Sequence, residues 1–152
     1  MIRYNGKTVE LNHFPDGTLL VKEAVAESDE AVLCWQFENN EEMVALYFLT
    51  KHLQAKGVER IVLELPYIPN ARQDRVKKPE DVFTLKYFAE FINSLGFAEV
   101  VVLDPHSNVS EALIDRIRIR TPKEYAERVK KAMAFLDGNY EDAESILQEK
   151  MM

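Results

Sequence analysis

The stretch that decides the fold is RIVLEL at residues 60–65, followed directly by PYIPNARQDR at residues 66–75. The first part is a short apolar run, which is typical of a buried strand. The second part places two arginines, an amide and a carboxylate where a parallel strand passes into a loop. In open α/β sheets, ligands bind beyond the carboxyl ends of the strands, and arginine suits phosphate groups and flat rings. The stretch therefore predicts a buried strand followed by a ligand-binding loop.

The segments around this strand alternate between strand and helix patterns. Residues 31–37 and 99–103 are apolar runs that predict two further strands. Residues 39–56 and 77–95 carry apolar side chains at helical spacing, and a glycine follows each of these two segments. This alternation predicts a mostly parallel sheet of about five strands with helices on both faces.

The two ends of the chain have a different pattern. Residues 8–11 and 18–22 flank the turn sequence FPDG, which predicts an N-terminal hairpin. Beyond residue 116, the sequence IRIR at residues 117–120 predicts one short strand, and residues 122–136 and 140–149 predict two helices. We therefore expect a single α/β domain at residues 1–116, with the strand and helical tail of residues 117–152 packed on it.

The length, charge and composition of the chain argue against several classes of protein. The chain has 152 residues and a formal net charge of −7, which argues against a nucleic-acid-binding surface. No apolar run approaches the roughly 18 residues of a membrane span, and the N-terminus has no apolar signal core. The single cysteine, Cys34, lies in an apolar run and is expected to be a buried thiol in a reducing compartment. We expect a cytoplasmic protein that binds neither nucleic acid nor membrane.

Three segments occur in a characteristic order and spacing: FPDG at residues 14–17, PYIPNARQDR at residues 66–75, and DPH at residues 104–106 after an apolar strand. Together they resemble the N-terminal half of the ribose-phosphate pyrophosphokinase (PRPP synthase) family. The resemblance covers roughly residues 2–115. It implies a phosphoribosyltransferase-like α/β fold, because the family is built from two similar α/β halves and transfers pyrophosphate from Mg·ATP to ribose 5-phosphate.

The resemblance implies a nucleotide-binding role for the loop after the central strand. Arg72 and Gln73 would contact ATP, with Arg72 near the phosphates and the ring. Asp74 and Arg75 would hold the loop through an ion pair or contact the nucleotide. Arginine can also form bidentate contacts to phosphate without any family analogy. A solvated turn whose charges pair with one another is the alternative for these four residues.

The resemblance also implies roles for the other two segments. His106 would be the catalytic residue, near the metal and the phosphates, and Asp104 would orient it or share the metal. Phe14 and Asp16 would reach the adenine of a nucleotide bound to a neighbouring subunit. The alternatives are a capping histidine at residue 106 and a Phe14 that packs on its own hairpin.

Metal chemistry is expected to be limited to magnesium that arrives with the nucleotide. The sequence has no Cys-x-x-Cys, His-x-x-x-His or EF-hand spacing, and no P-loop string. Magnesium bound with nucleotide phosphates keeps most of its waters and needs no structural protein site.

Three departures separate this chain from the family pattern. Thr18 stands where the family's turn ends in Glu, and SNVSEALI at residues 107–114 replaces a stretch that is usually rich in Gln and aromatic residues. The chain has no adjacent Asp-Asp and no Gly-Gly, so the sugar-phosphate loop of the family's C-terminal half is missing from it.

The sequence therefore predicts a domain that contributes Mg·ATP binding to pyrophosphate transfer and is inactive alone. Its expected partners are ATP together with further copies of itself, a separate C-terminal half or a full-length synthase. One alternative is a regulatory or interaction module that associates with a full-length synthase or senses nucleotides. Another is a relic that kept the fold and lost the ligand.

Overall fold

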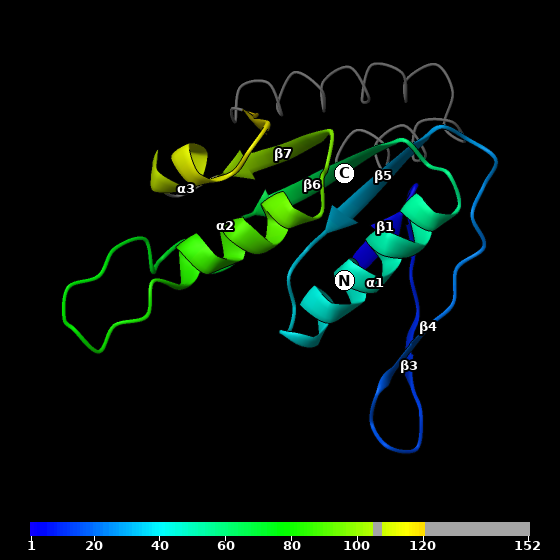
Figure 1. The fold of residues 1–152 in the computed structure, drawn as a ribbon, viewed down its shortest axis with the longest axis horizontal. Coiled ribbons are helices and arrows are strands. Elements are labelled where there is room, and N and C mark those ends of the chain that lie inside the picture. Colours follow the sequence, from blue (N-terminus) through cyan, green and yellow to red (C-terminus); the bar gives the residue numbers. More distant parts are fainter. Residues whose placement is uncertain (105–107, 121–152) are drawn as a thin grey trace, which may run out of the picture.

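The computed structural model describes residues 1–104 and 108–120, which form a mixed sheet covered by helices (Figure 1). Within these residues the larger sheet has six strands in the order β2-β1-β5-β6-β7-β8, and a separate hairpin pairs β3 with β4. In chain order the strands are β1 (Ile2–Tyr4), β2 (Lys7–Thr8), β3 (Leu11–His13), β4 (Leu19–Val21), β5 (Glu30–Trp35), β6 (Arg60–Tyr67), β7 (Glu99–Asp104) and β8 (Ile117–Ile119). The predicted α/β fold with a mostly parallel sheet is confirmed.

Parallel pairing dominates the sheet. Strands β5, β6, β7 and β8 are parallel neighbours, whereas β1 pairs antiparallel with both β2 and β5. Leu33 lies opposite Leu63, and Leu63 lies opposite Val100. These three side chains are almost completely buried, so a slip of one residue would turn them to the other face of the sheet. Burial of this row therefore fixes the register.

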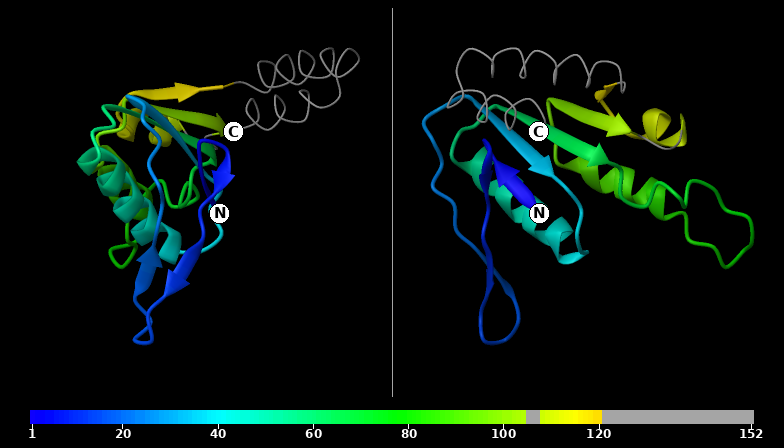
Figure 2. Two further views of the ribbon diagram at one scale, coloured as in Figure 1. Left: turned by 90° about the vertical axis from the view of Figure 1, so that its right-hand side faces the viewer. Right: turned by 180° about the vertical axis from the view of Figure 1, so that it is seen from behind.

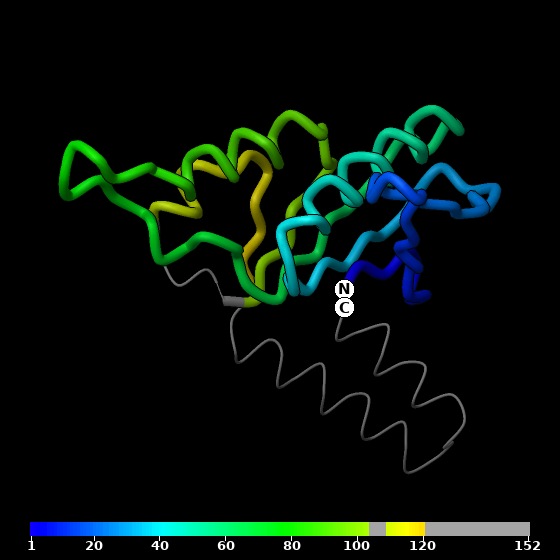
Figure 3. Tube along the Cα trace, turned by 90° about the horizontal axis from the view of Figure 1, so that it is seen from below, coloured from blue at the N-terminus to red at the C-terminus, as the bar shows by residue number. Residues whose placement is uncertain are grey.

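The helices that the structure describes lie on one face of the sheet (Figures 2 and 3). They are α1 (Glu41–Ala55), α2 (Thr84–Ser94) and the short α3 (Asn108–Leu113). The strand order advances in one direction from β5 to β8, and right-handed crossovers then place every connecting helix on the same side. The sequence predicted helices on both faces, but the crossovers supply only one. No described helix is long and apolar enough to cross a membrane.

The core lies between this face and the helices. Trp35 at the end of β5 is fully buried, and its ring packs 5.9 Å from Phe88 of α2 and 5.8 Å from Phe37. Leu46 and Leu49 of α1 are buried in the same cluster. The Cys34 thiol lies on the opposite side of β5 from Trp35 and is buried as predicted.

The hairpin of β3 and β4 projects from the body of the domain (Figure 2). Its turn is closed by the N–H of Phe14, which donates to the Thr18 carbonyl at 2.8 Å. Gly17 has φ of +87°, a backbone conformation that glycine adopts without strain. The hairpin forms around the predicted turn, but its first strand covers residues 11–13 and not residues 8–11.

Several boundaries differ from the sequence prediction. Strand β1 was not predicted, because three residues are too short for a clear alternating pattern. Helix α2 begins at Thr84 and not near residue 77, because Asp81 Oδ2 accepts the N–H groups of Lys77 and Lys78 and holds them in a turn. Helix α3 occupies a segment that carried no helix prediction.

Some predictions for the second part of the chain concern residues that the structure does not describe. Strand β8 pairs with β7 as the sixth strand of the sheet, where a short strand was expected. The predicted helices at residues 122–136 and 140–149 lie outside the described residues. The division at residue 116 stays a prediction.

A buried carboxylate, Glu42, fixes the start of α1. Its Oε1 accepts the N–H groups of Glu38 at 2.7 Å and Asn39 at 3.1 Å, and Asn39 Oδ1 accepts the Glu42 N–H at 3.2 Å. Its second oxygen forms an ion pair with the Met1 amino group. Burial would raise the pKa of Glu42, but the hydrogen bonds from the Met1 amino group and from the two backbone N–H groups outweigh it, and the pKa is lowered. Glu42 therefore joins the chain terminus, the loop after β5 and the helix.

We predict that Glu42→Gln lowers the free energy of unfolding at pH 7 by about 1–3 kcal/mol, because it removes a charge-assisted network. A lowered folded-state pKa means that the contribution is complete above the unfolded pKa of about 4.5 and is lost as the pH falls through the folded pKa. Urea unfolding at a series of pH values measures both effects. The exposed Glu90→Gln on α2 is the control and should change stability by less than about 0.5 kcal/mol. Equal stability of the Glu42→Gln variant and the wild type at pH 7 would contradict this role.

Candidate nucleotide-binding site

A hollow of about 520 Å³ lies where β5 and β6 end. Tyr67 is the last residue of β6 and lies opposite Asp104, the last residue of β7. The loop that follows β6 and Phe37, which follows β5, both line the hollow. The lining residues are Phe37, Tyr67, Ile68, Pro69, Asn70, Ala71, Arg72 and Gln73.

Two buried side chains and the turn between them hold the loop after β6 in place. Ile68 and Ala71 are buried in the core, and the Ala71 N–H donates to the Ile68 carbonyl at 3.3 Å. Asn70 has φ of +65°, in the left-handed region that asparagine tolerates better than most residues. With these residues anchored, Arg72 and Gln73 are exposed at the hollow.

A hydrogen bond between the Tyr67 side chain and the Phe37 backbone joins the segments that follow β6 and β5. The Tyr67 hydroxyl donates to the Phe37 carbonyl at 2.7 Å across 30 residues of sequence. The Phe37 ring packs on the buried Trp35, so this hydrogen bond is tied to the core. Tyr67 remains 36% exposed, which leaves part of its ring available for stacking. We call the Tyr67–Phe37 hydrogen bond the latch below.

Gln73 connects the loop to helix α2. The Thr84 hydroxyl donates to Gln73 Oε1, and the Leu85 N–H donates to the Gln73 carbonyl at 3.4 Å. The side-chain oxygen of Gln73 is therefore already hydrogen-bonded, and its side-chain NH₂ group can donate to a ligand.

Two charged residues of the loop, Asp74 and Arg75, interact with each other, whereas Arg72 does not share in this pair. Arg75 Nε lies 3.3 Å from Asp74 Oδ1, and Asp74 is much the less exposed of the two. The two side chains therefore form an ion pair, and their role in holding the loop or contacting a nucleotide stays a prediction. Among the described residues Arg72 has no ion-pair partner, so its guanidinium is available to an anion at the hollow. The alternative of a solvated turn with mutually paired charges fits Asp74 and Arg75 but not Arg72.

The structure describes the end of β7 but not the predicted catalytic residue that follows it. Strand β7 ends at Asp104, whose backbone lies opposite Tyr67 in the strand register. His106 lies outside the described residues, as does the side chain of Asp104. The roles of both residues stay predictions. The described part of the chain contains no group of three His, Cys, Asp or Glu residues that could hold a metal ion.

Phe14 and Asp16 lie far from the hollow within one chain. They occupy the turn of the β3–β4 hairpin, which projects on one side of the domain, whereas the β6–α2 connection extends on the other (Figures 1 and 3). Phe14 is 49% exposed, so it does not pack tightly on its own hairpin. Any contact between this turn and a ligand at the hollow needs a second chain.

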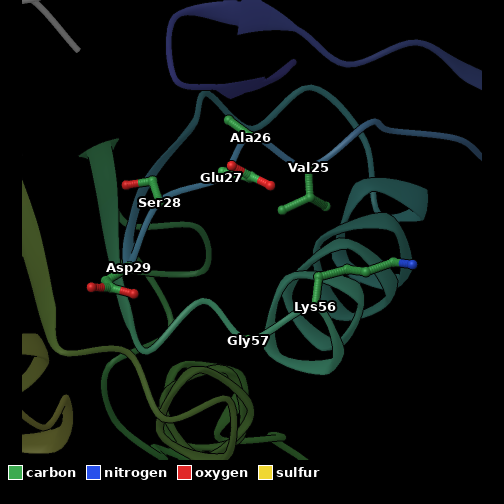
Figure 4. Close-up of a pocket in the computed structure, with 7 residues that line it drawn as sticks. All are labelled: Val25, Ala26, Glu27, Ser28, Asp29, Lys56 and Gly57. Atoms are coloured by element: carbon green, nitrogen blue, oxygen red, sulfur yellow. The ribbon is translucent and has the colours of Figure 1, made fainter.

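A second hollow, of about 470 Å³, lies at the opposite edge of the sheet, beside the start of β5 (Figure 4). Residues 25–29 line it together with Lys56 and Gly57. The Lys56 side chain points away from Glu27 and Asp29. The Asp29 carbonyl accepts the N–H groups of Glu59 and Arg60. The charged side chains around this hollow do not point toward a common centre. The hollow therefore has the features of a junction between loops.

Comparison with known proteins decides the family. The family described as the N-terminal domain of ribose phosphate pyrophosphokinase matches residues 2–96, more than half of the chain. This chain belongs to that family. The resemblance inferred from the three sequence segments is thereby confirmed.

The curated relatives of this chain are longer proteins. The ribose-phosphate pyrophosphokinase of Thermococcus kodakarensis is 31% identical over 103 residues, which are 65% of this chain and 35% of the relative. The enzymes of Saccharolobus solfataricus and Mycoplasma genitalium are 26% and 30% identical, over 64% and 72% of this chain and 35% and 34% of their own lengths. The chain therefore spans about a third of the length of the curated relatives it matches.

A solved structure shares the fold of this domain. The phosphoribosylpyrophosphate synthetase of Mycobacterium smegmatis superposes with a TM-score of 0.61 at 16% identity, covering 89% of this chain and 45% of that chain. At this identity the likeness supports the fold.

Thr18 has a specific structural role in this domain, at the position where the resemblance leads one to expect Glu. Its hydroxyl donates to Asp16 Oδ1 at 2.7 Å, and its backbone N–H donates to the same oxygen at 3.0 Å. The hydroxyl hydrogen bond, followed by the backbone one, lowers the pKa of Asp16. Thr18 therefore holds one oxygen of the Asp16 carboxylate inside the hairpin, and the other oxygen remains for a contact outside it.

We predict that Tyr67→Phe, which removes the latch, lowers the free energy of unfolding by about 0.5–1.5 kcal/mol. The amide protons of Ile68 and of residues 70–73 should exchange faster, because the loop loses its hydrogen bond to the segment after β5. Hydrogen exchange and urea unfolding measure the two effects. Tyr87→Phe, at an exposed position on α2, is the matched control. Unchanged exchange in the loop would show that the latch does not hold it.

Proposed function

We propose that this domain binds Mg·ATP at the hollow beyond β5 and β6 and contributes to pyrophosphate transfer to ribose 5-phosphate. One observation carries the proposal: Arg72 is exposed, without an ion-pair partner in the described residues, beside a hollow with aromatic side chains in its wall. A guanidinium can form bidentate contacts to phosphate oxygens, and aromatic faces accept a flat base. Magnesium would enter with the nucleotide phosphates, since the described residues offer no metal-binding group of their own.

Residues of the loop have separate roles in this proposal. Arg72 binds the phosphates or stacks on the base, and Gln73 donates from its NH₂ group. Asp74 and Arg75 keep the loop in shape through their ion pair. Tyr67 positions the loop through the latch. His106 and Asp104, from the adjacent strand end, act on the phosphates and the metal.

The remainder of the reaction needs further polypeptide. The chain covers about a third of its relatives, so we propose that the sugar phosphate is bound by a second α/β half that this chain lacks. Phe14 and Asp16 would complete the nucleotide site of a neighbouring copy. We expect no PRPP synthesis by the isolated chain. The proposed location is the cytoplasm, where the Cys34 thiol, whose pKa burial and the nearby Glu64 raise to about 11, would remain inert.

A second candidate function is a non-catalytic module that associates with a full-length synthase or senses nucleotides. The projecting hairpin with its exposed Phe14 favours it, because such a turn can contact another subunit without catalysis by this chain. A nucleotide-sensing module would use the same nucleotide site as the enzymatic candidate. PRPP production after addition of a separate C-terminal half would distinguish the enzymatic role from the regulatory one.

We predict that the purified chain binds Mg·ATP and that Arg72→Ala weakens binding about tenfold or more, the loss expected for a charge-assisted contact. Isothermal titration calorimetry measures the dissociation constants. Arg60→Ala is the matched control, because Arg60 begins the strand that Tyr67 ends and therefore lies at the opposite edge of the sheet. Binding weakened equally by both substitutions, or a folded wild-type chain that gives no binding, would contradict the proposal.

A further inference from the structure

The sheet has a second face, over which none of the helices described within residues 1–104 and 108–120 lies (Figures 2 and 3). Side chains alternate between the two faces of a strand, so this face carries the chain neighbours of the buried row of Leu33, Leu63 and Val100. The strand register places them in two rows: Arg3, Cys34, Glu64, Val101 and Arg118 in one, and Val32, Val62 and Glu99 in the other. We call the surface formed by these residues the second face.

Side chains of the second face are shielded from water, although α1, α2 and α3 lie on the other side of the sheet. Val101 is 5% exposed and Cys34 is 8% exposed. The ion pair between Arg120 Nη1 and Glu64 Oε1, which lie 3.9 Å apart, is also shielded, since these side chains are 19% and 13% exposed. Parallel strands occur almost only in sheets that are covered on both faces. The second face therefore has the burial of a covered surface and needs an element that the described helices do not supply.

We propose that residues 122–136 form a helix that packs on the second face of the same chain. Arg120 is the last residue that the structure describes, and the chain continues from it as residues 121–152. Residues 105–107, which also lie outside the described part, are too few to form a helix. Residues 121–152 are therefore the segment of this chain that is long enough to cover the second face.

The sequence of this segment predicts a helix with one apolar side. Thr121 precedes Pro122 and stands three residues before Glu124, which is the pattern of a capped helix start with proline at the first helical position. Five apolar side chains then follow at helical spacing: Tyr125, Val129, Ala132, Met133 and Leu136. The apolar side of such a helix needs an apolar surface to pack on, and the valines of the second face form one.

The end of β8 determines where this helix begins. Strand β8 ends at Ile119, and the Arg120 N–H still donates to the Val102 carbonyl at 2.8 Å, so the chain leaves the sheet directly before Thr121. A helix over residues 122–136 is about 22 Å long at 1.5 Å per residue. Strand β6, with eight residues, is about 26 Å long at 3.3 Å per residue. The helix therefore matches the strands in length when it runs back along them, and the side of the sheet that α1, α2 and α3 occupy is already taken.

The short connection favours this segment over a separate partner. A segment that is tethered next to its binding surface has an effective concentration of the order of millimolar. A separate protein at a lower concentration would have to bind the second face more tightly to take its place. A contact within one chain also does not depend on protein concentration, which distinguishes it from association between molecules.

The reactivity of Cys34 tests the proposal, because Cys34 is the single cysteine and lies on the second face. In the folded wild-type chain the thiol should react slowly with N-ethylmaleimide, at a rate that is independent of protein concentration. Val129→Glu should speed the reaction at least about tenfold, because it places a charge on the apolar side of the predicted helix. Ala134→Glu is the matched control, since residue 134 falls on the opposite side of that helix, and it should leave the rate unchanged. Mass spectrometry measures the rates, and circular dichroism shows whether each variant is folded.

Methyl NMR of the whole chain gives a second measurement. In Val129→Glu the methyl signals of Val62 and Val101 should shift, whereas those of Leu63, which points to the other side of β6, should stay in place. Tyr125→Ser, a neutral change on the apolar side of the predicted helix, should have the same effects. This variant keeps the test valid if Val129→Glu does not fold.

Three results would overturn the proposal. Rapid reaction of Cys34 in the folded wild type would mean that the second face is uncovered. Slow reaction and unmoved Val62 and Val101 signals in the folded variants would mean that another element covers it. Protection of Cys34 that is lost on dilution would mean that a separate molecule covers it.

Discussion

The parallel pairing of β5, β6 and β7 is the constraint on which the rest of the structure depends. It aligns Leu33, Leu63 and Val100 in one buried row, and burial of that row fixes the register of all three strands. Parallel strands end at the same edge of a sheet. Phe37, Tyr67 and Asp104 therefore lie near one another at this edge, although they are far apart in the sequence. The candidate nucleotide site is a consequence of this register.

Backbone groups freed at the strand ends are satisfied by a few side chains. Glu42 binds the N–H groups of the segment after β5, and Tyr67 binds the carbonyl of Phe37 in the same segment. Gln73 ties the far side of the loop to α2. The Glu42 contacts are partly shielded from water and therefore contribute more than the exposed Asp74–Arg75 pair. The hollow is thus supported from both sides by hydrogen bonds, while Arg72 remains available for a ligand.

The sequence predicted those features that depend on neighbouring residues. The strand at residues 60–65, the loop after it and helix α1 follow from local apolar patterns, and the structure contains all three. The contribution of Phe37 to the site could not be predicted, because it depends on a hydrogen bond to Tyr67 across 30 residues. The start of α2 was misplaced for a similar reason, since the turn at Asp81 competes with helical hydrogen bonds. The role of Thr18 could not be predicted either, because the sequence of a turn does not show which oxygen a threonine hydroxyl will contact.

The most direct test of the nucleotide site is an NMR titration of the ¹⁵N-labelled chain with Mg·ATP. We expect the largest amide shifts at Phe37, Tyr67, Ile68 and residues 70–73, around the hollow beyond β5 and β6. The amide signals of residues 25–29 and Gly57, around the hollow at the opposite edge, should remain unchanged. Shifts centred on that opposite hollow, or no shifts at saturating nucleotide, would contradict the assignment of the site.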